Sequence, residues 1–318
     1  MSKTRSTVVP EPRPRQAPQR MTRSGLPPAA DAALRAGFAW GERLTPGLAA
    51  RPAANLFLRL PPAPSQAKRH RAFSSGEPIP VRLNGAPIVA ERWGEGPTVH
   101  LVHGWGGWRQ QLGVYVEPLV AHGFSVVSYD GPSHGDSAPG RHGSGRTTML
   151  ELADALAAVV AATAPPFAVI AHSGAAIATG YAMSRPGSRI APQRLALISA
   201  SVDTADMLAS FTGRFGIGPR SAATMVERLQ RSLEVTMTDF DLPAAIGPLQ
   251  DADRLPQLLA VHDPGDPETP FGAAEALTAQ WPGAALRSVP GAGHHALLWH
   301  PATVAAVLSF LSTPSPVG

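Results

Sequence analysis

The chain has 318 residues, of which 44% are hydrophobic, 16% charged and 6% aromatic, and it contains no cysteine. This length can bury a sizeable core in one large domain or two small ones. The lack of cysteine excludes a disulfide scaffold, thiolate metal sites and a cysteine nucleophile. No run of 18 apolar residues is present, and the Arg/Pro-rich start lacks the apolar stretch of a secretory signal, so we expect a cytoplasmic protein.

The net charge of +4 is unevenly distributed along the chain. Residues 1–75 hold 13 Lys and Arg against 3 Asp and Glu, whereas residues 76–318 hold 14 against 20. A nucleic-acid-binding domain carries its positive charge on the folded part. Here the positive charge lies in the N-terminal quarter, so we expect no nucleic acid partner.

The first 78 residues divide into two parts. Residues 1–28 are rich in Pro and Arg without hydrophobic periodicity, which predicts a disordered leader. Residues 29–78 are predicted to form short amphipathic helices, broken at Pro46 and Pro52, followed by a basic, Pro-rich linker. Such helices could pack on the rest of the protein or lie on an anionic membrane surface, and packing is the favoured interpretation.

From residue 79 the pattern alternates between strands and helices. An Asn84-Gly85 turn indicates an opening β-hairpin. Buried strands are then expected at 98–102, 124–129, 167–171, 195–199, 257–261 and 285–289, and helices at 109–122, 147–163, 174–184, 271–281 and 302–312. This order predicts an α/β fold with a mostly parallel sheet and helices on both faces, spanning residues 79–318. Residues 202–254 have helical patterns but no strand, so we expect a helical cap inserted after the sixth strand, above the sheet edge where ligands bind.

Ser173 is a candidate nucleophile because it lies where a predicted strand ends and an apolar helix starts. Small residues, Ala171 and Ala175, stand two positions before and after it. A sharp turn between strand and helix requires such residues and gives the serine a strained backbone. A serine that only caps the helix is the alternative.

Glycines follow the strand at 98–102, in the sequence His103-Gly104-Trp105-Gly106-Gly107. Two backbone N–H groups aimed at one point stabilise a developing oxyanion. We expect the N–H groups of Trp105 and Gly174 to form such an oxyanion hole. A plain glycine turn is the alternative.

Two later strands are followed by residues that could complete a catalytic site. Asp266 follows the strand at 257–261 and is the favoured carboxylate, with Asp263 and Asp203 as alternatives. His294, after Gly291 and Gly293, is the favoured base.

A group of three histidines, His294, His295 and His300, lies near the C-terminus. It lacks the HExxH pattern and a carboxylate at ligand spacing, so no metal is expected.

The order Ser173, Asp266, His294, each after a successive strand, resembles the α/β-hydrolase superfamily over roughly residues 79–312. The HGWGG loop and the segment Asp130–Ser137 (DGPSHGDS) are similar to that family's HG loop and D-x-P-G-H-G-x-S motif. The chain differs at Ser133 and at Ala171, Ala175 and Ala176, where glycine is common.

The resemblance implies a serine hydrolase that needs no cofactor. Ser173 would attack a carbonyl carbon, His294 would transfer the proton, and Asp266 would hold the imidazole. The serine is unlike the aspartate nucleophile of haloalkane dehalogenases and epoxide hydrolases. The lack of cysteine likewise excludes the polyester synthase and dienelactone hydrolase branches.

Apolar side chains in residues 202–254 suit an acyl chain, although they could equally be ordinary packing residues: Met207, Leu208, Phe211, Phe215, Met225, Met237 and Phe240. We therefore expect a small-molecule ester substrate and a carboxylesterase or lipase-like activity. Thioesterase, C–C bond hydrolase and aminopeptidase activities share the same triad, and a non-catalytic binding protein is a further alternative. Arg109 and Arg146, the cations nearest the motifs, are expected at the surface. Oligomeric state is not predicted.

Overall fold

The computed structural model describes residues 27–62 and 75–313. The predicted leader, apart from its last two residues, and the middle of the predicted linker, residues 63–74, lie outside these ranges. Within the described part, no helix is both long enough and apolar enough to cross a membrane.

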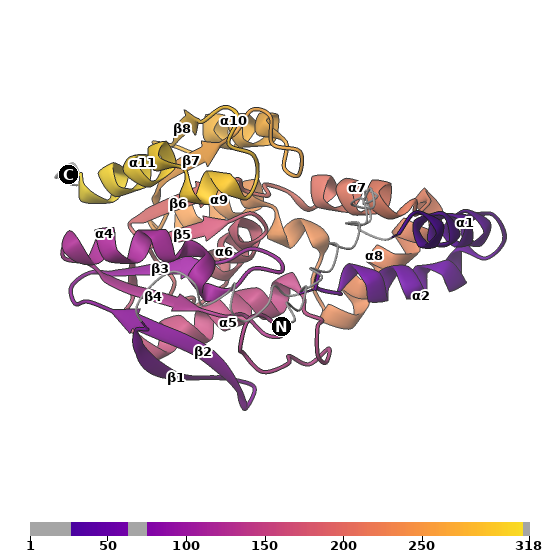
Figure 1. Ribbon diagram of the computed structural model, residues 1–318, viewed down its shortest axis with the longest axis horizontal. Helices are drawn as coiled ribbons and strands as arrows, with labels where there is room; N and C mark the ends of the chain where they lie inside the picture. The colour runs from indigo at the N-terminus through magenta and orange to yellow at the C-terminus, as the bar shows by residue number, and fades with distance from the viewer. Residues whose placement is uncertain (1–26, 63–74, 314–318) are drawn as a thin grey trace, which may run out of the picture.

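One eight-stranded sheet forms the centre of the molecule, with strand order β1-β2-β4-β3-β5-β6-β7-β8 (Figure 1). β1 pairs antiparallel with β2 across the Asn84-Gly85 turn, and β2 pairs antiparallel with β4. All other pairs are parallel. The predicted hairpin and parallel sheet are therefore confirmed. The strands are β1 (Glu77–Leu83), β2 (Ala86–Trp93), β3 (Thr98–Val102), β4 (Ser125–Tyr129), β5 (Pro166–His172), β6 (Arg194–Ile198), β7 (Gln257–His262) and β8 (Ala285–Ser288).

Helices cover both faces of the sheet. The central strands are apolar throughout because alternate residues enter different cores: in β5, Val169 and Ala171 face one side and Ala168 and Ile170 the other. The first face carries α5 (Met149–Ala162), α6 (Ala175–Ser184), α9 (Leu242–Asp251) and α10 (Phe271–Gln280). The second carries η1 (Arg109–Tyr115), α4 (Val116–Ala121), η3 (Ala296–Trp299) and α11 (Pro301–Ser312).

Two helices precede the sheet, α1 (Pro28–Leu44) and α2 (Pro46–Phe57). Pro46 is the first residue of α2, where a missing N–H costs nothing. Pro52 lies inside α2, so the expected break there is wrong. Pro52 is exposed, so the carbonyl that loses its donor can be hydrated instead.

The α1 and α2 helices pack with α7 (Thr204–Phe215) and α8 (Pro219–Leu233), and we call these four helices the four-helix unit. The unit has a core of its own, in which Phe38 of α1 and Ala53 of α2 meet Met225 of α8. The predicted cap segment is thus helical, but only its first half joins this unit. The second half, η2 (Met237–Phe240) and α9, packs on α6 in the main core.

Three buried histidines make the stability of the fold depend on pH. Burial lowers the pKa of His100 to about 4 and those of His134 and His172 to about 3. In an unfolded chain a histidine has a pKa near 6.5. Below pH 6.5 the unfolded chain therefore binds more protons than the folded one, and stability falls as the pH falls toward 4.

We predict that lowering the pH from 7 to 5 reduces the free energy of unfolding by about 2 kcal/mol for each of these histidines. Urea denaturation followed by circular dichroism at both pH values measures this decrease. His100→Gln can keep the hydrogen bond to Thr163 Oγ1, which His100 Nε2 makes at 3.0 Å, but cannot take up a proton. The variant should show a smaller decrease than the unaltered protein, and equal decreases would contradict the prediction.

Candidate active site

Ser173 lies on the sharp turn between β5 and α6 that the sequence predicts. Its φ of +54° is in the left-handed region, which confirms the expected backbone strain. The Ser173 N–H donates to the carbonyl of Ile198 at 3.0 Å, which ties the turn to β6. Gly104 passes so close that a Cβ there would lie 3.0 Å from the Cβ of Ser173. Glycine at 104 therefore lets the loop after β3 approach the serine.

Ser173, His294 and Asp266 lie together at the carboxyl ends of the parallel strands. The Ser173 Oγ is 3.0 Å from His294 Nε2. The opposite ring nitrogen, Nδ1, is 2.9 Å from one Asp266 oxygen and 3.2 Å from the other. Both nitrogens of this imidazole are thus engaged in one serine–imidazole–carboxylate chain.

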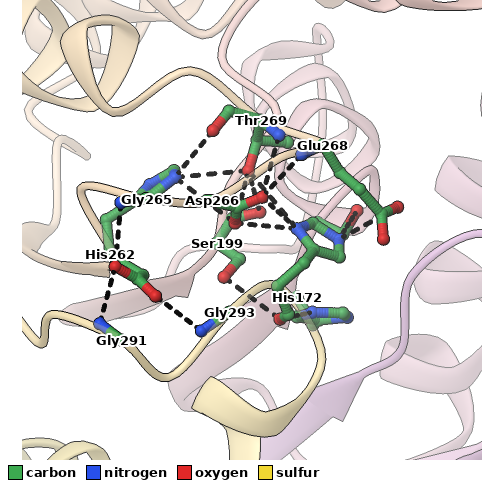
Figure 2. A network of polar contacts seen from close by, with 12 residues as sticks. His172, Ser199, His262, Gly265, Asp266, Glu268, Thr269, Gly291 and Gly293 are labelled. Atoms are coloured by element: carbon green, nitrogen blue, oxygen red, sulfur yellow. Dashed lines mark hydrogen bonds and ion pairs between the residues drawn. The ribbon is translucent and has the colours of Figure 1, made fainter.

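The carboxylate of Asp266 is held by several donors besides His294 (Figure 2). One oxygen accepts from the N–H groups of Glu268 at 2.8 Å and Thr269 at 3.1 Å, and the other accepts from the Thr269 hydroxyl at 3.0 Å. Burial alone would raise the pKa of Asp266, but the hydrogen bonds from His294, Glu268 and Thr269 outweigh it and hold this pKa well below its usual value. The group is therefore a carboxylate across the physiological range.

The two alternative carboxylates have other partners. Asp263 accepts from the N–H groups of Gly265, Gly291 and Gly293 at 2.9, 3.1 and 2.5 Å, which fixes the loop that carries His294. These backbone donors, led by Gly293, lower the pKa of Asp263. Asp203 caps α7 by accepting from the Asp206 N–H at 2.7 Å.

The predicted oxyanion donors lie on the two loops that meet at Ser173. Within residues 27–62 and 75–313, the N–H groups of Trp105 and Gly174 donate to no other residue. His134 fixes the Trp105 loop, because its Nε2 accepts from the Gly106 N–H at 3.0 Å. Because burial keeps the pKa of His134 near 3, this nitrogen remains an acceptor at neutral pH.

Arg109 is buried instead of lying at the surface as expected, because three carboxylates surround it. Its Nη1 lies 2.5 Å from Asp130 and 2.9 Å from Asp136, and its Nε lies 3.0 Å from Glu91. Asp130 also accepts from the N–H groups of Arg109 and Asp136 at 2.6 and 2.9 Å. The DGPSHGDS segment is thereby fixed behind the Trp105 loop. Arg146, by contrast, is exposed.

The DGPSHGDS segment departs from the related motif at Ser133, and the structure gives a reason for the usual glycine. Ser133 has a φ of +64°, in the left-handed region that glycine adopts without strain. The Ser133 hydroxyl donates to the carbonyl of Gly143 at 3.1 Å.

Four residues of the site were not singled out in the sequence. Thr269 donates to Asp266, and Ser199, at the end of β6 with a φ of +46°, donates its hydroxyl to the His294 carbonyl at 3.2 Å. Glu268 is half exposed and lies 3.3 Å from His295 and 3.9 Å from His294 Nε2. His172 is buried beside His294, with 5.0 Å between ring centres. The sequence signal that could have identified two of them was position: His172 is the last residue of β5, and Ser199 directly follows β6.

Three imidazoles cluster here, although they are not the three weighed in the sequence. His172, His294 and His295 each offer a ligand atom within 4.8 Å of the others. His300 instead caps α11 by accepting from the Ala302 N–H. A metal bound by the cluster would compete with Ser173 and Asp266 for His294, because both of its nitrogens are already used.

Comparison with known proteins identifies the family. A family model described as the alpha/beta hydrolase family matches residues 101–307, more than half of the chain. The chain belongs to the alpha/beta hydrolase family. Among curated proteins, none matches it.

Three solved structures illustrate how this family member compares with others. A membrane phospholipase A, described as a bacterial virulence factor, has a TM-score of 0.56 and 16% identity over 89% of this chain and 96% of that one. The thioesterase domain from the curacin biosynthetic pathway has a TM-score of 0.53 and 16% identity over 76% and 100%. A thermophilic esterase from Thermogutta terrifontis has a TM-score of 0.50 and 21% identity over 74% and 98%. At these identities the likeness establishes a shared fold.

We predict that Arg109→Met lowers the free energy of unfolding by about 3–5 kcal/mol, because it leaves the buried Asp130 carboxylate without its cation. Arg185→Met is the matched control, since Arg185 pairs with Asp154 at 2.6 Å near the surface and exposed pairs contribute little. Urea denaturation of both variants measures the difference. Equal losses in the two variants would contradict the bridging role of Arg109.

Proposed function

We propose that this family member is a serine hydrolase that cleaves carboxylic esters through an acyl-enzyme. The observation that carries the proposal is the continuous contact from Ser173 Oγ to His294 Nε2 at 3.0 Å and from His294 Nδ1 to Asp266 at 2.9 Å. Catalysis by an activated serine requires this arrangement of nucleophile, base and orienting carboxylate. A serine that only caps a helix would not need a base within hydrogen-bonding distance.

The proposed reaction has two steps. His294 takes the proton of the Ser173 hydroxyl as its oxygen attacks the ester carbonyl, and then gives this proton to the departing alcohol. Water, deprotonated by His294, attacks the acyl-enzyme and releases the carboxylic acid and free Ser173. Asp266 stays ionised throughout, orients the ring and stabilises the imidazolium.

The negative charge that forms on the carbonyl oxygen needs donors that are already in place. The backbone N–H groups of Trp105 and Gly174 are suited to this role, because neither is used within the described residues and both flank Ser173. In known serine hydrolases the loss of one such donor costs about 3–4 kcal/mol of transition-state stabilisation.

An apolar acyl or alcohol group is supported by side chains beside the serine. Met149 contacts the turn, since a Cβ on Gly174 would lie 3.0 Å from its Cε, and Trp105 is half buried in the loop opposite. The apolar residues of the predicted cap support an acyl-binding pocket less than the sequence predicted, because many of them pack inside the protein. Met225 and Phe240 are buried, Phe211 packs edge-on against Phe57, and Leu208 and Phe215 pack in the core of the four-helix unit.

Thioesterase activity is the second candidate, because a thioester presents the same carbonyl to the same triad and a thioesterase domain is among the similar structures. C–C bond hydrolysis and aminopeptidase activity use this triad as well. A non-catalytic binding role is disfavoured by the short Ser173–His294 contact.

We predict that a fluorophosphonate probe labels Ser173 in the folded protein, because the reagent reacts with serines activated by a neighbouring base. Peptide mass spectrometry locates the label, and Ser173→Ala is the control that should abolish it. Ester and thioester panels of increasing chain length then define the substrate. A folded protein that stays unlabelled would argue for the binding role.

We also predict different effects for the two neighbouring carboxylates. Asp266→Asn should lower kcat on an ester substrate by roughly 10⁴-fold, as the equivalent change does in a serine protease, because the imidazole loses its correct tautomer. Asp263→Asn should mainly lower the melting temperature, because Asp263 contacts backbone N–H groups and not the imidazole. Steady-state kinetics and thermal denaturation of both variants test this, and the reverse pattern would reassign the acid to Asp263.

A further inference from the structure

The α1 and α2 helices of the four-helix unit expose large apolar side chains. Among the described residues, five large hydrophobic side chains are exposed, and three of them lie within nine residues of one another. Trp40 is 63% exposed, Leu44 70% and Leu48 61%. Trp40 and Leu44 are four residues apart on α1 and therefore share one side of that helix. Exposed apolar clusters of this kind mark surfaces that bind a protein, a ligand or a membrane.

The other exposed residues of α1 and α2 are mostly small or cationic. The other exposed residues of α1 are mostly alanines, with Arg43 beside Leu44, and Arg51 is exposed on α2. The acidic residues of α1 face inward: Asp31 pairs with Arg35, and Glu42 accepts from the N–H groups of Arg220 and Ser221 on α8. No exposed carboxylate thus occurs in the described parts of α1 and α2. We call the surface formed by Trp40, Arg43, Leu44, Leu48 and Arg51 the apolar–basic face.

We propose that the apolar–basic face binds the surface of an anionic lipid bilayer. Trp and Leu side chains insert between headgroups and acyl chains, while arginines pair with lipid phosphates and anionic headgroups. The proposal does not depend on the reaction that Ser173 catalyses.

The charge of the whole chain supports lipid as the occupant. Residues 1–75 carry a large excess of positive charge and residues 76–318 an excess of negative charge. An anionic surface therefore attracts the N-terminal part of the sequence and repels the rest. The α1 helix lies at one end of the molecule's long axis, at the right of Figure 1.

The same charges disfavour a second copy of the chain as the occupant. In a two-fold symmetric dimer each partner contributes the same patch. Arg43 and Arg51 of one copy would then approach those of the other without an exposed carboxylate on α1 or α2, within the described residues, to pair with them.

The test measures flotation of the full chain with vesicles of equal parts phosphatidylglycerol and phosphatidylcholine at 0.1 M NaCl, and with phosphatidylcholine alone. We expect binding to the anionic vesicles only. The triple variant Trp40→Ser, Leu44→Ser, Leu48→Ser should bind at least about tenfold more weakly because the inserted side chains are lost. The double variant Arg43→Glu, Arg51→Glu should bind similarly weakly, and binding of the unaltered chain should fall in 0.5 M NaCl.

Matched controls distinguish the loss of this face from a loss of apolar or positively charged side chains elsewhere on the surface. Val114→Ser removes an exposed apolar side chain outside the four-helix unit, and Arg141→Glu, Arg287→Glu makes the same change of charge elsewhere on the surface. Both should bind within about twofold of the unaltered chain, as should Ser173→Ala, which tests the reaction separately. All variants are compared by circular dichroism, and the targeted side chains are exposed, so folding should be kept.

Two results would overturn the proposal. One is unchanged flotation of the triple variant. The other is a dimer, detected by analytical ultracentrifugation, that the triple variant converts to a monomer while vesicle binding stays the same. That second result would assign the face to contact between copies of the chain.

Discussion

The parallel pairing of β3, β5, β6, β7 and β8 is the constraint on which the site depends. Parallel strands end at the same edge of a sheet, so residues far apart in the chain meet there without any long loop. The loops after these strands supply Trp105, Ser173, Ser199, Asp266 and His294 in turn. Each loop contributes one or two groups, and hydrogen bonds between neighbouring loops fix their relative positions.

Three buried carboxylates fix different parts of the candidate site. Asp130 fixes the segment behind the Trp105 loop, Asp263 fixes the glycine loop before His294, and Asp266 contacts the imidazole itself. All three are satisfied largely by backbone N–H groups or by Arg109, so their charge is stabilised within the fold and not by solvent. The loops that form the candidate site are consequently fixed relative to one another by contacts within the chain.

The sequence predicted the sheet, the sharp turn and the approach of Ser173 to His294, because strand periodicity and small residues around a serine are local signals. It favoured Asp266 but left Asp263 open, since both follow β7 within four residues and only the path of the loop decides which one meets the ring. It placed Arg109 at the surface because the partners Glu91 and Asp136 are remote in the chain. It predicted that α1 is amphipathic but not its partners, because amphipathic spacing does not show what covers the apolar side, here α2, α7 and α8.

The strand-like segment after α2 has a consequence for how this protein can be shortened. The Leu58 carbonyl accepts from the Thr147 N–H, the Leu60 N–H donates to the Gly145 carbonyl, and Pro61 lies where a side chain on Gly106 would be. Residues 58–61 therefore cover the loop that carries the Trp105 N–H. A chain trimmed to the start of β1 would keep Ser173, Asp266 and His294 yet open that loop to water, so the smallest unit that keeps the candidate site intact begins before the sheet does.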